Sequence, residues 1–201
     1  MEPDEIVTNS FEVSGLPTTE IQDEMHMPTC DYSVKSGSIH GPPSTFANVG
    51  ETVFHVWECK GNDMGMLVKK CFVTDGEGED RAVIDFDGCS TDTSLLSQVT
   101  YDESLMRAHA QSQVFKYADS NQLYFTCQIR LCQKQMGMCE GITPPDCGSR
   151  RNTTSARRKR ALLINEHEDF EVDVATPEML ILSRDELLQL GKTEFLVFFA
   201  I

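Results

Sequence analysis

The sequence predicts an all-β fold: an antiparallel sandwich stapled by disulfides, with a flexible linker and a short tail of strand and helix. Between residues 51 and 132, short segments rich in β-branched and aromatic residues are separated by Gly, Asp, Asn or Ser. Eight cysteines at irregular spacing lie between Cys30 and Cys147, a pattern typical of a disulfide framework in an oxidising compartment. With 201 residues, 40% of them hydrophobic, the chain is long enough for one domain with its own core.

Residues 1–29 mix Pro, Thr, Glu and Asp with isolated apolar residues, and we interpret them as an interdomain linker. The strands predicted after this linker cover residues 51–59, 66–73, 81–89, 112–118 and 122–132. The alternation is clearest in the last strand, where one parity carries Leu123, Phe125, Cys127, Ile129 and Leu131. Cys127 is therefore expected to face the core.

Two segments between these strands are less regular. In residues 101–111, Leu105, Met106 and His109 fall at helical spacing, which predicts a short helix or a loop insertion. The acidic sequence DGEGEDR, at residues 75–81, has two interpretations, a calcium-binding loop or a hairpin turn. It lacks the EF-hand pattern, so we favour the turn.

After the last predicted strand the chain changes character. Residues 149–160 carry no aliphatic or aromatic side chain beyond one alanine, which predicts an exposed polar linker. In the tail, residues 161–201, apolar residues alternate over 170–174 as in a strand. The sequence SRDELLQLG then predicts a short helix, with Ser183 as its N-cap and Glu186 at the third helical position.

The formal net charge of the chain is −15, yet its basic residues concentrate in one place. Residues 150–160 carry six basic and no acidic side chains, whereas residues 1–149 carry 23 acidic and 9 basic ones. Phosphate backbones would repel so acidic a chain, so nucleic acid is not an expected partner. The isolated basic block needs an explanation of its own.

The cysteines and histidines do not fit a metal site. The last four cysteines are spaced C-x4-C, C-x6-C and C-x7-C, without the paired C-x2-C knuckles of zinc sites. The histidines are scattered and are expected on the surface or packed; they are His26, His40, His55, His109 and His167. The sequence also lacks a nucleophile elbow, a Gly-rich phosphate loop and a metal-binding helix. We therefore expect no metal, no cofactor and no enzymatic activity.

The basic block contains Arg157, Arg158, Lys159 and Arg160, which fit the R-x-K/R-R pattern cut by furin-like proteases. The acidic subsites of these proteases need several cations on an accessible loop. The alternative is a nuclear localisation signal. The cysteines favour the secretory route, as does Asn152, which begins an N-glycosylation triplet in the same linker. We expect cleavage in this linker, a glycan on Asn152 and an extracellular location.

The two ends of the chain carry further expectations. The first ten residues have neither a basic start nor an apolar stretch, so they are not a signal peptide, and we expect the chain to lack its own beginning. At the other end, Phe195–Ile201 are seven apolar residues, where a membrane span needs about 20. We expect them to be a truncated span or a final strand.

Three stretches, together with the basic site, resemble a known family. They read HMPTCDYSV, ANVGETVFHVWEC and QLYFTCQIRLCQKQMGMCEGITPPDC. They are similar to the carboxy-terminal half (ZP-C) of a zona pellucida (ZP) domain, and most similar to nematode cuticlins and cuticlin-like proteins. The resemblance runs from about Thr29 to Arg160. It implies that residues 30–148 form a ZP-C domain with an immunoglobulin-like sandwich.

The resemblance also implies a mechanism of processing and assembly. Precursors of this family are made on a membrane anchor, cut at the basic site and polymerised with other ZP-domain proteins into extracellular filaments. A hydrophobic patch after the cut, here about residues 169–182, docks in the module as a strand and blocks assembly until it is released. The tail 161–201 is then a propeptide. The implied disulfides join Cys71 to Cys127, Cys89 to Cys147 and Cys132 to Cys139, which leaves Cys30 with Cys59.

The expected function is therefore a structural precursor for an extracellular matrix such as a cuticle. Two alternatives stay open, a secreted signalling precursor and a receptor or co-receptor ectodomain. Many growth-factor precursors keep the cysteine-rich part after the cut, whereas all eight cysteines of this chain precede it. The other half of a ZP domain, ZP-N, carries the family's main polymerising surface and is not in this sequence, so we expect the chain to be a fragment or an unusual product.

Overall fold

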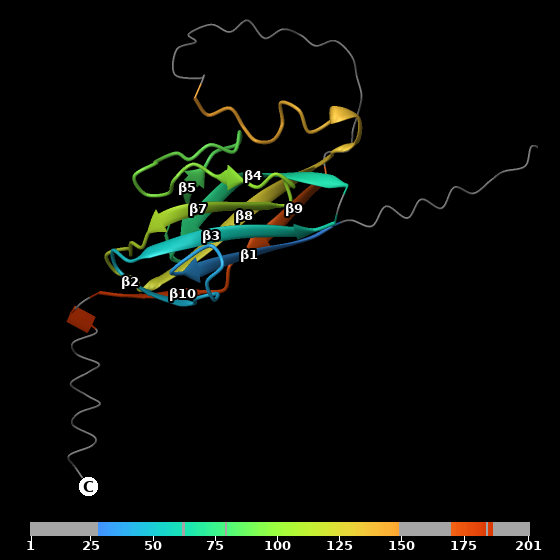
Figure 1. Ribbon diagram of the computed structural model, residues 1–201. Helices are drawn as coiled ribbons and strands as arrows, with labels where there is room; N and C mark the ends of the chain where they lie inside the picture. The colour runs from blue at the N-terminus through green and yellow to red at the C-terminus, as the bar shows by residue number, and fades with distance from the viewer. Residues whose placement is uncertain (1–27, 62, 79, 149–169, 184, 187–201) are drawn as a thin grey trace, which may run out of the picture.

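The structure, a computed structural model, describes residues 28–61, 63–78, 80–148, 170–183 and 185–186. These residues form ten strands and one short 3-10 helix (Figure 1). The strands are β1 (Thr29–Ser36), β2 (Phe46–Asn48), β3 (Thr52–Lys60), β4 (Met64–Thr74), β5 (Arg81–Ile84), β6 (Thr100–Tyr101), β7 (Arg107–Gln113), β8 (Gln122–Gln133), β9 (Phe170–Ala175) and β10 (Met179–Leu182), and the 3-10 helix is Gln135–Gly137.

The strands form two sheets that pack face to face. One sheet has the order β1-β3-β7-β6, and the other has the order β2-β10-β8-β4-β5, with β9 also paired to β8. Figure 1 shows β3 and β7 in front of β8 and β4, and buried side chains from both sheets meet in one core cluster. The predicted all-β sandwich is confirmed. The pairing of β10 with β2 is parallel, which makes the second sheet mixed.

Strand β8 lies at the centre of the second sheet. Its side chains alternate between buried and outward positions from Leu123 to Leu131, as the sequence predicts. Cys127 is buried, which confirms that it faces the core. One edge of β8 pairs with β4, and its other edge pairs with β9 and β10.

The first sheet buries the only tryptophan of the chain. Trp57 on β3 has no exposed surface, and its ring stacks on that of Tyr32 on β1 with centroids 4.9 Å apart. Across the other edge of β3, Trp57 pairs with Ala108 and His55 pairs with Ala110 on β7. Large rings on one strand therefore lie beside methyl groups on the next, and this difference in size lets the two layers interdigitate.

The helix predicted over residues 101–111 is wrong. A hairpin forms there instead: β6 pairs with β7, and Leu105 takes a positive φ of 55° in the turn. Strand β7 does alternate between buried and outward positions, but its buried residues are small, namely Ala108, Ala110 and Ser112. Small side chains give a weak hydrophobic signal at a period of two, so the helical spacing of Leu105 and Met106 dominated the pattern.

Other strands also differ from the sequence prediction, including the one predicted over residues 81–89, which ends at Ile84. The strand predicted over residues 112–118 ends at Gln113, although Val114 still bonds through its backbone to Glu51 and Gly50. Strand β1 and the three-residue strand β2 were not predicted. Strand β2 is too short to show a period.

The acidic segment 75–81 joins β4 to β5, which pair antiparallel, so its interpretation as a hairpin turn is confirmed. The Asp75 carboxylate accepts the backbone N–H of Gly78 at 2.8 Å and that of Glu77 at 3.1 Å. These bonds lower the pKa of Asp75 from its ordinary value. The carboxylate therefore organises the turn itself.

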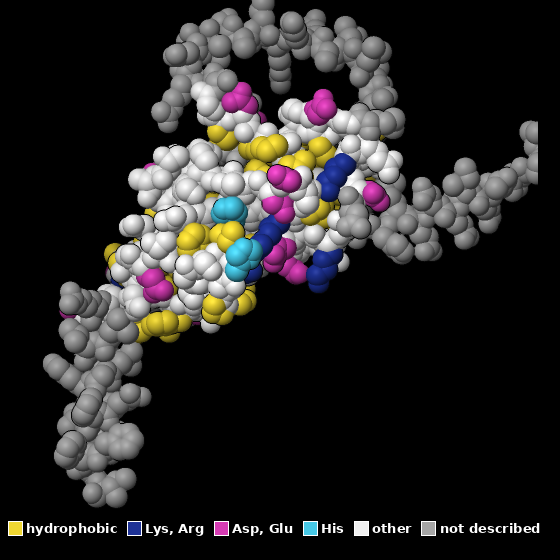
Figure 2. Space-filling model, viewed as in Figure 1, with side chains coloured by type: hydrophobic (Ala, Val, Ile, Leu, Met, Phe, Trp, Pro, Cys, Tyr) yellow, Lys and Arg dark blue, Asp and Glu magenta, His cyan; other side chains and the backbone are white. Residues whose placement is uncertain are grey.

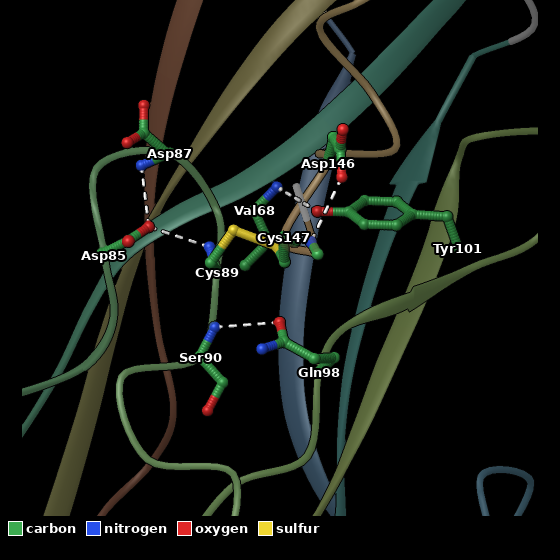
Figure 3. The surroundings of a disulfide bond; sticks show 10 residues. Val68, Asp85, Asp87, Cys89, Ser90, Gln98, Tyr101, Asp146 and Cys147 are labelled. Atoms are coloured by element: carbon green, nitrogen blue, oxygen red, sulfur yellow. Dashed lines mark hydrogen bonds between the residues drawn. A yellow bond between two sulfur atoms is a disulfide. The ribbon is translucent and has the colours of Figure 1, made fainter. Parts of the chain in front are cut away.

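Four disulfides use all eight cysteines, and they are the pairs that the resemblance implies: Cys30–Cys59, Cys71–Cys127, Cys89–Cys147 and Cys132–Cys139. The first joins the neighbouring strands β1 and β3, and the second joins β4 and β8. Figure 3 shows the third, between the loop after β5 and the loop after the 3-10 helix. None of the four joins one sheet to the other.

Candidate functional site

Strands β9 and β10 lie end to end along one edge of β8. Strand β9 pairs antiparallel with Thr126–Leu131, and β10 pairs antiparallel with Gln122 and Leu123. Between them Thr176 stays bonded to β8, because its N–H donates to the Phe125 carbonyl and its hydroxyl accepts the Phe125 N–H. The predicted docking patch 169–182 is thus two strands, with Asp169 outside the described residues. We call residues 28–148 the module.

The two tail strands are buried to different depths. On β10, Met179 and Ile181 are almost fully buried, and only Leu180 points outward. On β9, Val174 is buried, whereas Glu171 and Asp173 are exposed. Strand β10 also lies between two partners, β8 and β2, while β9 pairs with β8 alone in the described part of the chain. Most of the tail's contribution to the core therefore comes from β10.

Strand β10 covers a small cavity at the end of the sandwich. The cavity has a volume of about 10 Å³, and its lining comprises Val53, His55, Ser112, Gln113, Val114, Phe115, Leu123, Phe125, Met179 and Ile181. Only the last two of these residues belong to the tail. Removal of β10 would therefore open an apolar surface of the module to solvent.

His55 is the polar exception in this cavity. Its Nδ1 lies 2.7 Å from the Tyr32 hydroxyl, and its Nε2 lies 2.9 Å from the Ser112 hydroxyl. The ring packs edge-on against Phe125, with centroids 4.8 Å apart. Burial lowers the pKa of His55 to about 4 and raises that of Tyr32, so the imidazole is neutral near pH 7. His55 was expected on the surface or packed, and it is packed.

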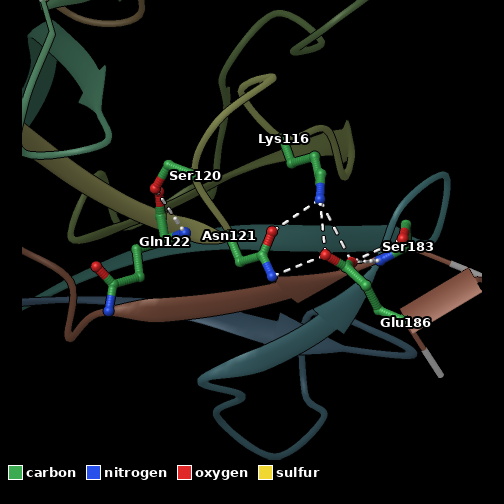
Figure 4. A network of polar contacts seen from close by, with 6 residues as sticks. All are labelled: Lys116, Ser120, Asn121, Gln122, Ser183 and Glu186. Atoms are coloured by element: carbon green, nitrogen blue, oxygen red, sulfur yellow. Dashed lines mark hydrogen bonds and ion pairs between the residues drawn. The ribbon is translucent and has the colours of Figure 1, made fainter. Parts of the chain in front are cut away.

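The end of the tail is held by a second set of contacts, which we call the tail latch: Lys116 and Asn121 of the module with Ser183 and Glu186 of the tail (Figure 4). The Glu186 carboxylate accepts the Ser183 N–H and hydroxyl, each at 2.7 Å. It also accepts Asn121 Nδ2 at 3.0 Å and Lys116 Nζ at 3.1 Å. These donors, Ser183 first, lower the pKa of Glu186 to about 2.

The sequence anticipates half of the tail latch. Ser183 and Glu186 were predicted as a helix cap, and Asp185 and Glu186 do begin a helical turn. Lys116 and Asn121 were missed, because they lie in the connection between β7 and β8, about 65 residues away in the chain. Nothing in their local sequence marks them as partners of a distant carboxylate.

Strand β9 adds polar contacts of its own. Lys69 on β4 forms an ion pair with Glu171, and Gln128 on β8 donates to the Asp173 carboxylate at 3.3 Å. The side chain of Lys69 is 12% exposed and that of Glu171 is 32% exposed, so this pair is partly buried and helps to retain β9. The bond from Gln128 to Asp173 is long and lies in solvent, where such contacts contribute about 1 kcal/mol or less.

The outer face of the other sheet has a different character. Figure 2 shows basic, acidic and histidine side chains mixed over β1, β3 and β7. On β3, Glu58 lies 3.7 Å from Lys35 Nζ and 3.0 Å from Arg107 Nε. Charges of opposite sign on this face therefore neutralise one another. The contacts that hold the tail lie in the other sheet, around β8.

The predicted processing residues, Asn152, Arg157, Arg158, Lys159 and Arg160, lie outside the described residues. Their place in the chain is nevertheless informative, because they fall between the module, which ends at Gly148, and β9. All eight cysteines precede them, so no disulfide joins the module to the tail. A cut in this linker would leave the tail held by non-covalent contacts alone.

The disulfide Cys89–Cys147 fixes the module just before this linker (Figure 3). The Asp85 carboxylate accepts the Cys89 N–H at 2.9 Å, and Ser90 N–H donates to the Gln98 side chain at 3.1 Å. Cys147 is therefore tied to an ordered loop of the module. The chain is therefore covalently fixed to the module just before the linker begins.

No group of three or more His, Cys, Asp or Glu side chains in the described residues is placed to hold a metal ion. The described residues also contain no helix with the length and apolar character needed to cross a membrane. The apolar segment Phe195–Ile201 lies outside them.

Comparison with known proteins gives the family. Residues 26–150, more than half of the chain, match the cuticlin C-terminal domain. The chain belongs to the cuticlin family. This cuticlin chain is 45% identical to Cuticlin-6 of Caenorhabditis elegans over 151 residues, which cover 72% of the chain and 26% of that relative.

Two further cuticlins of Caenorhabditis elegans are similar to it. Cuticlin-5 is 35% identical over 198 residues, 95% of the chain and 50% of that relative. Cuticlin-3 is 36% identical over 150 residues, 73% of the chain and 38% of that relative. The chain thus spans half the length of these relatives or less. The similarity to Cuticlin-5 extends over most of the basic linker and the tail.

Proposed function

We propose that this cuticlin chain is part of a precursor of a structural cuticle protein, and that its tail keeps the module from assembling until the basic linker is cut. Membership of the cuticlin family supports the role in a cuticle. In this proposal the chain acts as a building block and not as an enzyme, and its membership of the cuticlin family supports that role. Its place of action is the extracellular matrix, reached by the secretory route.

One observation carries the release step: β9 and β10 occupy an edge of β8, yet only the backbone of the linker ties them to the module covalently. While the linker is intact, the tail has a high effective concentration at its own site. After a cut it becomes a separate peptide that dissociates by dilution. The linker is therefore the natural place for a control step.

Loss of the tail would change the surface of the module in two ways. The backbone N–H and C=O groups along one edge of β8 would lose their partners, and such an edge pairs readily with another chain. The apolar residues under β10, including Leu123 and Phe125, would also meet solvent. Both changes favour association, and in this proposal other ZP-domain proteins, of the same or another kind, are the partners.

The cut itself is assigned to a furin-like protease acting at Arg157, Arg158, Lys159 and Arg160. A glycan on Asn152 would lie five residues before this motif and keep the linker in solvent. A membrane anchor, where the precursor has one, belongs to the part that follows the described tail. Cleavage then separates the module from tail and anchor together.

The test uses the natural precursor with its secretion signal, made in animal cells, and compares incorporation into sedimentable filaments. Replacing Arg157 and Arg160 by Ala should leave secretion unchanged, because these residues lie outside the packed module. The tail then stays attached, and incorporation into filaments should fall about tenfold or more.

The matched control replaces Arg150 and Arg151 by Ala, which removes two charges from the same linker outside the cleavage motif. This variant should be cut and should assemble as the unchanged precursor does. Equal assembly of the uncut Arg157 and Arg160 variant would overturn the release step.

A further inference from the structure

The tail is held at two places that use different contacts. Strand β9, the part nearer the basic linker, pairs with β8 over six residues and leaves Phe170 and Val172 only partly buried. Strand β10 and the tail latch lie at the far end, where Met179 and Ile181 are buried. A cut in the linker therefore leaves the far end of the tail held by its buried side chains and by the latch.

From this arrangement we infer that the tail latch sets how long the cleaved tail stays on the module, so that cleavage and release are separate steps. This inference rests on the proposed function, because it gives a rate-setting device to the same tail. The device consists of Lys116 and Asn121 on the module and Ser183 and Glu186 on the tail.

The module side of the latch is organised without the tail carboxylate. Lys116 Nζ donates to the Asn121 side-chain oxygen at 2.7 Å, which orients the Asn121 amide nitrogen toward Glu186. The Asn121 backbone carbonyl also accepts the N–H of Ile181 on β10. Asn121 thus holds the tail at two points, and its donor is in position before the carboxylate arrives.

The tail side presents a carboxylate with a complete set of donors. Glu186 accepts bonds from both module residues and from Ser183, and bonds to an ionised group are about twice as strong as neutral ones. Its side chain is 33% exposed and that of Lys116 is 22% exposed, so salt can reach the pair. The latch should therefore weaken as ionic strength rises.

Acid should not open the latch in the ordinary range. The bonds to Glu186 hold its pKa at about 2, so the carboxylate stays charged well below neutral pH. The latch then holds the tail throughout the mildly acidic range, and its release follows salt or competition and not protonation of Glu186.

The test follows the tail after a defined cut. The full secreted chain carries a fluorophore at its carboxy terminus, is cut with a purified furin-like protease, and is separated by gel filtration at intervals. The variants Glu186→Gln and Lys116→Met remove the charge from either side of the latch. Each should release the tail about tenfold faster than the unchanged chain, in line with the loss of a charge-assisted bond.

The matched control is Asp173→Asn, which removes an exposed carboxylate from β9 on the same tail, where it accepts the 3.3 Å bond from Gln128. Its release rate should stay within about twofold of the unchanged chain. Raising the salt from about 0.1 M to about 0.5 M, which strengthens the screening of exposed charges, should speed release of the unchanged tail and leave Glu186→Gln less affected. The two-site variant Lys116→Met with Glu186→Gln should be no faster than either single variant.

Equal release rates for Glu186→Gln and Asp173→Asn would overturn the latch. If Glu186→Gln fails to be secreted, Lys116→Met on the module side decides the question. Filament assembly is a separate readout: filaments that form with the labelled tail still bound would contradict the proposed function, while the comparison of release rates would still judge the latch.

Discussion

His55 is a neutral imidazole in the core, and its neutrality is a condition of the packing around it. Both ring nitrogens have hydroxyl partners, Tyr32 and Ser112, and β10 covers the cavity next to the ring. The other rings and side chains that line this cavity are uncharged at neutral pH. A proton added to His55 would therefore place a charge without a counter-ion in an apolar site.

The pKa of His55 gives a direction for the effect of pH on stability. Its value in the folded chain, about 4, is below the ordinary value of 6.5, so the unfolded chain binds the proton more tightly. The stabilising effect of neutral His55 is complete above pH 6.5 and is lost as the pH falls toward 4. We expect the free energy of unfolding to fall by about 2 to 3 kcal/mol between pH 7 and pH 4.5, measured by denaturant titration.

Replacement of His55 by Gln keeps hydrogen-bonding groups but removes the titration, so this variant should be less stable and nearly flat in the same pH window. The pKa values of Asp75 and Glu186 are lowered, so those carboxylates lose their effect only below this window. The pKa of His109, on the outer side of β7, is also lowered, by partial burial and by Arg107 and His40, so His109→Gln serves as the comparison and should remove a smaller part of the slope than His55→Gln. Parallel curves for the unchanged chain and the His55 variant would exclude this explanation.

At the scale of elements, whether a strand can be predicted from the sequence depends on the size of its buried residues. Strand β8 was predicted because its buried parity is Leu, Phe, Cys and Ile. Strand β7 was predicted as a helix or loop because its buried residues are alanine and serine. These residues are small because the rings of Trp57 and His55 on the neighbouring strand fill the space beside them. The information that makes β7 a strand lies in its neighbour, so no local pattern carries it.

The tail also shows that local sequence predicts only local structure. The alternation over 170–174 and the cap at Ser183 and Glu186 were predicted from local sequence, and both are present. The parallel pairing of β10 with β2 and the partners of Glu186 were not predicted, because they depend on how distant segments meet. Cysteine pairing was open on spacing alone and followed only from the resemblance.

Strand β10 offers a direct test of where the tail's stability lies. Ile181 is fully buried against the module, whereas Leu180, its neighbour on the same strand, is 41% exposed. Ile181→Ala should lower the free energy of unfolding by about 2 to 5 kcal/mol, since it leaves a cavity under β10. Leu180→Ala, the control, should cost about 0.5 kcal/mol or less in the same denaturant titration. Equal costs would mean that β10 does not pack as described.

At the scale of the whole molecule, the tail is part of the same sheet as β8, so its proposed release would change that sheet. Strand β2 pairs with β10 and with no other described strand, so release of the tail removes all of its ladder bonds. Strands β1 and β3 keep their pairing and their disulfide. The cleaved module is therefore expected to lose order locally, around β2, and to stay folded elsewhere.

Hydrogen exchange on the cleaved protein would measure this change. After release of the tail, the backbone amides of residues 46–48 should exchange about tenfold or more faster, because their partner strand has gone. Amides of β3 within 53–57, which bond to β1 and β7, serve as the internal control and should be unchanged. Protection of 46–48 that is the same before and after release would show that β2 has another partner.

The placement of the four disulfides makes the mechanical resistance of the module depend on direction. Each bond lies within one layer or in the loops attached to it, so each sheet resists stretching along its own plane through covalent links as well as ladder bonds. Between the layers, apart from the loops that connect them, the load falls on side-chain packing, which yields and recovers without breaking a bond. A matrix built from such units would be stiff along its sheets and compliant across them.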